Sequence, residues 1–256
     1  MDAALLLLAD SRLPSGGHAH SGGLEPAASA GVVADVAGLE SFLRGRLATS
    51  GLVAAAIAAA AHACGPEGWA RLDREADART PSPAQRRASR AQGRSLLRAV
   101  RIAWPDAVLG TLAGLNESGP HHPVVLGAAV AAQGPTTASS DDRHGATGGD
   151  LGTSSPPPPP YDDRPEDAGR GARAAALVAA YGAVTGPASA AVRLLGLDPL
   201  AVHRVLAGLA DEIDAVAARA AACATGDPAD LPAVSAPMLD VYAELHLRAD
   251  LRLFES

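Results

Sequence analysis

Residues 51–64 read GLVAAAIAAAAHAC, a run of small and aliphatic side chains broken by a single histidine. A helix that is apolar on nearly every face belongs in the interior of a protein. The run is also too short to cross a bilayer, which takes about 20 apolar residues. The stretch therefore predicts a central buried helix, and no other segment predicts a membrane span.

The composition of the whole chain favours helices. Aromatic residues make up 3% of the sequence, and alanine dominates the apolar residues. Such residues suit helices that pack closely through small side chains better than they suit pleated sheets. A chain of 256 residues can also bury a core of its own. We expect a single all-α domain over residues 1–256, a bundle of roughly eight to ten helices.

Caps, prolines and glycines predict where the helices begin and end. The helices expected in the first half of the chain span residues 3–9, 23–30, 35–48, 51–64, 68–78, 83–102 and 105–115, followed by one that begins near Pro123. Two stretches follow over 172–195, broken at Gly186 and Pro187, and over 199–223, capped by Asp198. The closing helix, 237–251, has four residues at core spacing: Leu239, Tyr242, Leu245 and Ala249.

Residues 134–173 differ from the rest of the chain. They are rich in proline, glycine and serine, and Leu151 is their one aliphatic residue beyond alanine. Such a segment buries too little apolar surface to offset about 1 to 2 kcal/mol of backbone entropy per residue. We expect a disordered insertion loop within the domain.

Several function classes find no support in the sequence. The chain has no Walker loop, GxSxG, HExxH or Rossmann fingerprint, which disfavours an enzyme. The first residues, MDAALLLLAD, lack the basic start of a signal peptide. Cys64 and Cys223 are too few and too far apart for a disulfide framework. We expect a cytoplasmic, non-catalytic protein without a tightly bound cofactor.

A glycine-rich turn over residues 13–25, LPSGGHAHSGGLE, carries His18 and His20 one residue apart. On a helix such side chains point about 200° apart, so a shared metal would need the looped backbone that the glycines permit. A transition-metal site takes three or four ligands, and the other histidines form no cluster beyond the pair His121 and His122. Two interpretations stay open: a metal-binding turn, or a polar loop that binds its own backbone.

The helix expected over 83–102 carries arginine at every fourth position: Arg86, Arg90, Arg94 and Arg98. No acid lies between Pro83 and Trp104, and like charges at this spacing repel by about 0.2 to 0.5 kcal/mol per pair. Acidic helices of the same fold, such as the one with Asp211, a protein partner or nucleic acid could offset the charge. The net charge of -7 and the lack of interleaved aromatics disfavour nucleic acid.

The glycine-rich turn also resembles the opening pattern of the UreF family of urease accessory proteins, LPxGxFxxSxGLE. The matching residues are Leu13, Pro14, Gly16, Ser21, Gly23, Leu24 and Glu25. Further blocks that look like the family's follow in its order: GRSLLR (93–98), HHPVVLG (121–127), SAAVRL (189–194) and PMLDVYAELHLRADLRLFES (237–256). The resemblance covers nearly the whole chain outside residues 134–173.

The resemblance implies an all-helical, dimeric, non-catalytic protein. It implies a urease maturation chaperone that bridges the UreG GTPase and the UreD protein, also called UreH, to apo-urease during GTP-dependent nickel insertion, with nickel handled by the complex. The structural residues of the family motifs are Pro14, Gly16, Ser21, Gly23, Glu25, His122, Pro123, Arg193 and Asp240. The predicted partner-binding residues are Arg86, Arg90, Arg94, Arg98, His246, Arg252 and Phe254.

Two alternatives accompany this prediction. The first is a nickel-binding metallochaperone that uses His18 and His20, and the second is a helical nucleic-acid binder that uses the stripe from Arg86 to Arg101. The chain also departs from the family pattern: His18 replaces a phenylalanine, GLDP (196–199) replaces PLGQ, Leu247 replaces an acid and Glu255 replaces an arginine. Altered partner contacts are expected at these positions.

Overall fold

The computed structural model describes residues 3–10, 12–14, 20–133, 165–249 and 253–254. The described residues form ten α-helices and no strand, which confirms the all-α prediction. The α-helices are α1 (Ala3–Ala9), α2 (Leu24–Ser29), α3 (Val36–Arg46), α4 (Leu52–Ala78), α5 (Pro83–Ala103), α6 (His122–Ala132), α7 (Pro165–Leu195), α8 (Pro199–Gly208), α9 (Ala210–Ala221) and α10 (Pro237–Leu247). A π-helical turn, η2 (Leu47–Gly51), and two 3-10 helices, η3 (Ala107–Gly114) and η4 (Pro228–Asp230), complete them.

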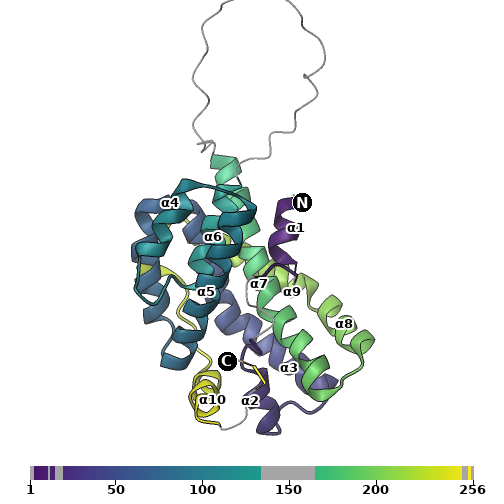
Figure 1. Cartoon of the computed structure of the whole chain (residues 1–256). Coiled ribbons are helices and arrows are strands. Elements are labelled where there is room, and N and C mark those ends of the chain that lie inside the picture. Colours follow the sequence, from purple (N-terminus) through teal and green to yellow (C-terminus); the bar gives the residue numbers. More distant parts are fainter. Residues whose placement is uncertain (1–2, 11, 15–19, 134–164, 250–252, 255–256) are drawn as a thin grey trace, which may run out of the picture.

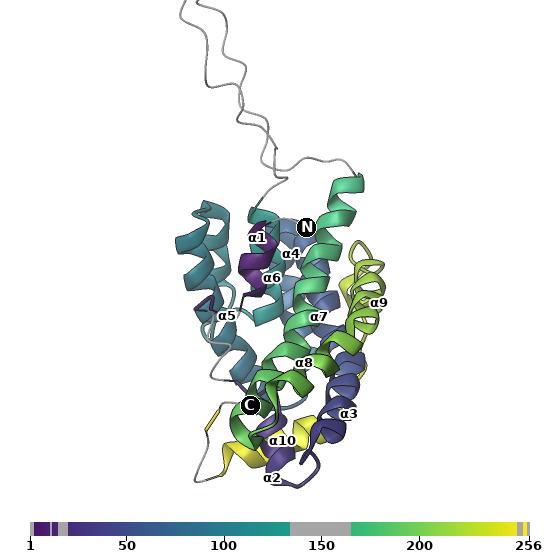
Figure 2. The same cartoon turned by 90° about the vertical axis from the view of Figure 1, so that its right-hand side faces the viewer.

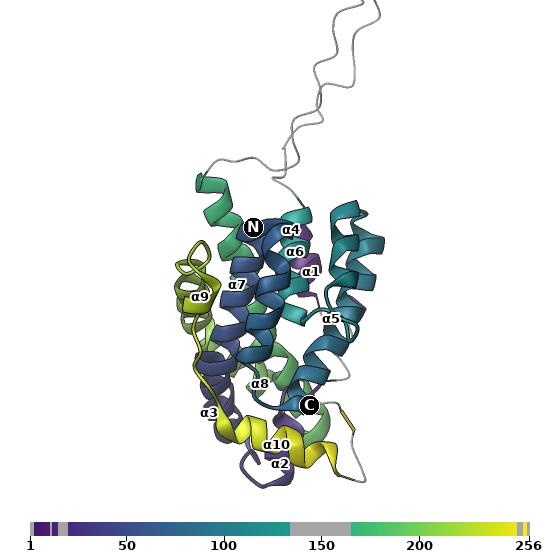
Figure 3. The same ribbon diagram turned by 90° about the vertical axis from the view of Figure 1, so that its left-hand side faces the viewer.

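Helices α4, α6 and α7 form the centre of the bundle (Figures 1 and 3). Helix α5 packs outside α6, while α3, α8 and α9 lie beside α7. Figure 2 shows the short α1 in front of α6, between α5 and α7. Helices α2 and α10 contact each other at the end where the C-terminus lies. Helix α2 and the C-terminal part of the chain therefore meet at one end of the bundle.

Small residues let the central helices approach closely. The alanines of α4 from Ala55 to Ala61 are buried, as the opening run predicts. A Cβ atom at Gly127 of α6 would collide with the carbonyl oxygen of Ala58 in α4. A Cβ atom at Gly93 of α5 would likewise collide with the carbonyl oxygen of Pro120. Glycine thus sets the distances on both sides of α6.

The helix ends follow local signals where the sequence carries them. The Asp35 side chain accepts a hydrogen bond from the Gly38 amide at 2.8 Å, and Asp198 accepts from the Leu200 amide at 3.1 Å. The interruption between the helices expected over 51–64 and 68–78 is confirmed, because Gly65 has a φ of 62° in the left-handed region. Helix α4 therefore consists of two segments.

Helix α7 corrects two predictions. The break expected at Gly186 and Pro187 is wrong, since the helix continues to Leu195 with Pro187 inside it. Proline has no N–H for the carbonyl of Ala183, four residues earlier, and the Nε of Arg46 donates to that oxygen instead, at 2.9 Å. The disordered insert was expected over 134–173, but residues 165–173 are the first turns of α7. The rest of that insert lies outside the described residues.

Two further helix predictions were wrong. The stretch 199–223 forms two helices, α8 and α9, which meet at the fully buried Leu209. Helix α10 ends at Leu247, and it buries Leu239, Ala243 and His246. Leu245, expected in the core, is 57% exposed because it lies on the opposite face.

Two helical stretches, Val36–Ala78 and Gly169–Leu195, are long and apolar enough to cross a membrane by length and composition. Within their most apolar windows, 61% and 50% of the residues are buried inside the molecule. The two stretches contact each other through α4 and α7 in the core. Burial in a core accounts for their apolar character, and the cytoplasmic location stays a prediction.

Candidate functional site

Five side chains from three distant parts of the sequence meet at the end of the bundle where α2 contacts α10. We call them the terminal clasp: Ser21, Glu25, Arg193, His246 and Phe254. The buried carboxylate of Glu25 accepts hydrogen bonds from the backbone amides of Leu253 and Phe254, each at 2.8 Å. The hydroxyl oxygen of Ser21 accepts one from the Glu25 amide at 3.2 Å. Carboxylates bound by backbone amides form strong, charge-assisted hydrogen bonds. The clasp therefore fixes the described part of the C-terminal tail to α2.

The other two side chains of the clasp hold the last aromatic residue. The Nε2 atom of His246 lies 3.0 Å from the Phe254 carbonyl oxygen and 3.4 Å from the Glu25 carboxylate. The guanidinium of Arg193 lies over the Phe254 ring, 4.5 Å from its centroid, which is a cation–π contact. Helix α7 and helix α10 thus both position the tail.

The local backbone explains how Glu25 reaches the tail. Gly22 and Gly23 have φ values of 62° and 88°, a conformation that glycine adopts at little cost. This turn starts α2, so that Glu25 lies in its first turn. A Cβ atom at Gly23 would lie 3.0 Å from the Leu239 side chain of α10. Glycine at this position therefore allows the close contact between α2 and α10.

The other motif residues and several predicted contacts lie away from the clasp or outside the described part of the chain. Gly16, His18, Arg252 and Glu255 are outside it, so the structure says nothing of them. Pro14 is described but belongs to none of the clasp contacts. Asp240 faces α5, where its carboxylate accepts from the Ser82 amide at 3.4 Å. Burial raises the pKa of Asp240, although this hydrogen bond opposes the effect.

The sequence analysis missed Glu244, which joins α10 to the start of α5. Its carboxylate accepts from the Ser82 hydroxyl at 2.6 Å and from the Ala84 amide at 2.8 Å. These two hydrogen bonds lower the pKa of Glu244. Ser82 in turn caps α5 by accepting from the Gln85 amide. A helix cap shared with a second helix has no signal in the local sequence.

The arginine helix, α5, places Arg90 in the interior. Its guanidinium binds Asp73 at 3.0 Å, Asp77 at 2.6 Å and the Gly119 carbonyl at 2.5 Å. His121 joins the same acids, because its amide donates to Asp73 and its Nε2 lies 2.9 Å from Asp77. Buried charges require such complete pairing. Arg90 therefore links α4, α5 and the loop before α6, and its acids come from α4 and not from the helix with Asp211.

Ser89, His121 and Asp77 have the connectivity of a serine hydrolase triad, with 2.9 Å between Ser89 Oγ and His121 Nδ1. Burial of His121 and the shared use of Asp77 favour a structural role. Burial lowers the pKa of His121, so the neutral ring donates through Nε2 to Asp77. Partial burial raises the pKa of Asp77, but hydrogen bonds from His121 and Arg90 outweigh it and the net shift is downward. With His121 almost fully buried and Asp77 shared with Arg90, this set stabilises the fold.

The other arginines of α5 are more accessible. Arg86 donates to the Thr80 carbonyl at 2.7 Å and to the Pro81 carbonyl at 3.0 Å. Arg94 binds the Ser118 carbonyl, and both Arg94 and Arg98 are exposed. Partner binding by Arg86, Arg94 and Arg98 stays a prediction, whereas Arg90 contacts other residues of its own chain.

Of the two histidines of the glycine-rich turn, only His20 is among the described residues. No group of three or more histidine, cysteine or acidic side chains there could hold a metal ion. His20 is buried near His122, the first residue of α6. Burial lowers the pKa of His122 to about 4, and the charge of His20 contributes in the same direction. The hypothesis of a metal at His18 and His20 stays untested.

The fold and the clasp define an all-α protein whose described polar clusters hold its helices and its C-terminal tail together. The family model of UreF matches residues 33–139 and 166–210. The urease accessory protein UreF of Mycobacterium sp. (strain JLS) is 43% identical over 252 residues, which are 98% of this chain and 97% of that protein. The UreF of Mycolicibacterium vanbaalenii is 40% identical over 260 residues, 99% of this chain and 98% of its own.

The urease accessory protein UreF of Mycobacterium tuberculosis (strain ATCC 25618 / H37Rv) is 41% identical over 246 residues, 95% of this chain and 93% of that protein. The chain belongs to the UreF family of urease accessory proteins. The resemblance inferred from the five sequence blocks is therefore confirmed.

Proposed function

We propose that this protein is a urease maturation chaperone that bridges the UreG GTPase and the UreD/UreH protein to apo-urease and supports GTP-dependent nickel insertion. Similarity over nearly the whole chain to proteins named urease accessory protein UreF carries the proposal. Nickel is the cargo of the complex in this proposal. No tightly bound cofactor and no catalytic step are assigned to this chain.

An exposed apolar surface on α10 supports a role in protein binding. Met238, Val241 and Leu245 are 56%, 48% and 57% exposed. Positions three and four residues apart share one face of a helix, so these side chains form a single stripe, which we call the α10 stripe. Exposed apolar patches mark protein interaction sites. The clasp and Glu244 hold α10 in place, so we propose that the α10 stripe contacts a protein of the maturation complex.

Co-purification tests this function. The tagged chain is produced with UreD/UreH, UreG and the urease subunits from the same source, and captured proteins and nickel-dependent urease activity are measured. Wild type should capture the partners. The double variant Val241→Asp, Leu245→Asp should capture about a tenth or less of the wild-type amount, because a tenfold loss of affinity equals about 1.4 kcal/mol of binding free energy. Val32→Asp, at an exposed valine distant in sequence from α10, is the matched control. A wild-type chain that captures none of these proteins contradicts the proposal.

We also propose that the protein is a homodimer. Light scattering on the purified chain should give twice the 25.5 kDa of one chain. A mass of one chain at micromolar concentration contradicts this.

The nickel-binding alternative has its own test. Calorimetry with Ni²⁺ compares wild type with a His18→Ala, His20→Ala double variant. Equal, weak heats for both proteins would remove the alternative. The nucleic-acid alternative is not advanced, because Arg90 at the centre of its stripe is buried and paired with Asp73 and Asp77.

A further inference from the structure

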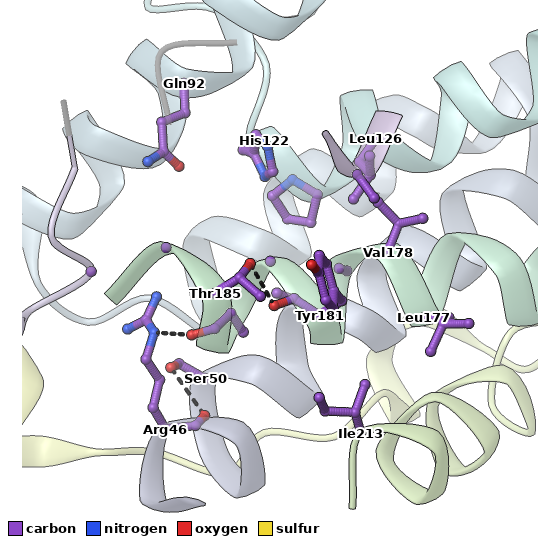
Figure 4. A pocket seen from close by; sticks show the side chains of 18 of the residues that line it. Arg46, Ser50, Gln92, His122, Leu126, Leu177, Val178, Tyr181, Thr185 and Ile213 are labelled. Carbon is purple, nitrogen blue, oxygen red and sulfur yellow. Dashed lines mark hydrogen bonds between the residues drawn. The ribbon is translucent and has the colours of Figure 1, made fainter. Parts of the chain in front are cut away.

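Arg46, the last residue of α3, extends toward α7 and is fixed there by one hydrogen bond. Its Nε donates to the Ala183 carbonyl at 2.9 Å (Figure 4). That carbonyl is free because Pro187, four residues later, has no N–H to donate. A Cβ atom at Gly22 would lie 3.2 Å from Cζ and from Nη2 of Arg46, so the guanidinium packs beside a glycine. Neither Nη group donates a hydrogen bond to another described residue, so both remain as donors.

Arg46 carries a charge that the described chain does not neutralise. Its neighbour Arg44 pairs with Glu40 at 3.0 Å and with Glu212 at 3.3 Å. Among the described residues, by contrast, no carboxylate forms an ion pair with Arg46, and burial is the cause that lowers its pKa to about 10. A partly buried guanidinium without a counter-charge is less stable than one paired with a carboxylate. An anion from outside the described chain would supply that counter-charge.

Arg46 lines an open groove that runs along α5, α6 and α7 and is also lined by residues of α1, α8, α9 and α10. The groove has a volume of about 2180 Å³ and includes Arg46 and Ser50 among its lining residues. Figure 4 shows Gln92, His122 and Thr185 around the same space. Apolar side chains line much of the remainder. Pockets for small molecules usually have volumes of about 300 to 1,000 Å³, so this groove has room for a segment of a protein.

We propose that this groove, which we call the Arg46 groove, binds a protein segment that places an aspartate or glutamate carboxylate on the two Nη groups of Arg46. Charge complementarity selects this occupant, because a guanidinium edge binds a carboxylate through two parallel hydrogen bonds. Leu126 and Val178 offer an apolar wall for the rest of the segment. That the segment belongs to a protein partner rests on the proposed function.

A first experiment probes the carboxylate site on the full chain alone. Sodium acetate is titrated at constant ionic strength against sodium chloride, and the NMR signal of the Arg46 Nε–H group is followed. Wild type should show a saturable shift with an apparent dissociation constant in the millimolar range. Arg46→Lys keeps the charge but loses the paired donors, and Arg46→Met removes both. Acetate-dependent thermal stabilisation should therefore weaken about tenfold in the lysine variant and vanish in the methionine variant. Arg44→Met, on the same helix, should behave as wild type.

A linear, unsaturated response, or equal acetate stabilisation of wild type and Arg46→Met, overturns the carboxylate site. Folding is controlled in the same melts. Because Arg46→Met removes an uncompensated charge as well as one hydrogen bond, its melting temperature should lie within about 4 °C of wild type. Arg46→Lys repeats the comparison with the charge retained.

A second experiment tests the protein occupant by co-purification with the urease maturation proteins. Arg46→Met should capture about a tenth or less of the partner that wild type captures, and Arg44→Met should capture the same amount as wild type. Equal capture by Arg46→Met and wild type overturns the occupant while the proposed function stands, even if acetate binds. If wild type captures no partner, the proposed function itself fails.

Discussion

His122 shows how a single side chain makes the stability of this fold depend on pH. Burial, and then the nearby charge of His20, lowers the pKa of His122 to about 4. Histidine in an unfolded chain titrates near 6.5. The folded state therefore binds fewer protons than the unfolded state between pH 6.5 and pH 4. The stability from neutral His122 is fully present above pH 6.5 and is lost as the pH falls toward 4.

We expect this residue to reduce the free energy of unfolding by about 1 to 2 kcal/mol between pH 7 and pH 5. His122→Gln, which cannot be protonated, should lose that part of the pH dependence, measured by urea denaturation at both pH values. His203→Gln changes an exposed histidine of α8 and should keep the wild-type difference. An unchanged pH dependence in His122→Gln would show that another group is responsible.

At the scale of elements, the contact between α4 and α6 depends on Gly127. A methyl group at this position would collide with the Ala58 carbonyl oxygen and lie 2.8 Å from the Ala61 side chain. Gly127→Ala should therefore separate the helices and lower the free energy of unfolding by about 1 to 3 kcal/mol, despite the higher helix propensity of alanine. Urea denaturation measures the change.

Gly182 of α7 is the matched control, because it is also a glycine inside a helix but is exposed, with no atom within 4 Å of a Cβ there. Gly182→Ala should raise the free energy of unfolding by up to about 1 kcal/mol. If both substitutions stabilised the protein, the close approach of α4 and α6 would not limit the packing.

Helix ends could be predicted from the sequence where their signals are local. Asp35 and Asp198 cap helices through amides two or three residues away. The break expected at Pro187 was wrong because the compensating donor, Arg46, lies 137 residues before the Ala183 carbonyl that accepts from it. Nothing near Pro187 indicates that donor.

The same limit applies to the candidate site. The sequence placed Glu25 in the first turn of a helix, where a carboxylate suits the helix dipole. Its partners at Leu253 and Phe254 lie 228 and 229 residues away, and only the fold brings them together. His246 binds that tail, and this contact determines which face of α10 is buried. Leu245 lies on the opposite face and is therefore exposed.

At the scale of the whole molecule, the terminal clasp couples the first and last parts of the chain. Glu25→Gln replaces a buried carboxylate oxygen by an amide NH₂ that cannot accept from the tail amides. The loss should be about 2 kcal/mol of unfolding free energy, measured by urea denaturation. Removal of residues 253–256 takes away the same two donors. Because Glu25 then has no tail amide to bind, the double change should cost little more than the truncation alone.

This double-mutant cycle should give a coupling energy of about 1 to 2 kcal/mol between α2 and the C-terminal tail. Glu40→Gln is the matched control, since Glu40 pairs with Arg44 on an exposed part of α3, away from the tail. Its effect and that of the truncation should add within about 0.5 kcal/mol. Simple additivity for Glu25 would mean that the tail and α2 are stabilised independently. Coupling confined to Glu25 would instead mean that a partner which displaces the tail also loosens α2, the helix that follows the glycine-rich turn.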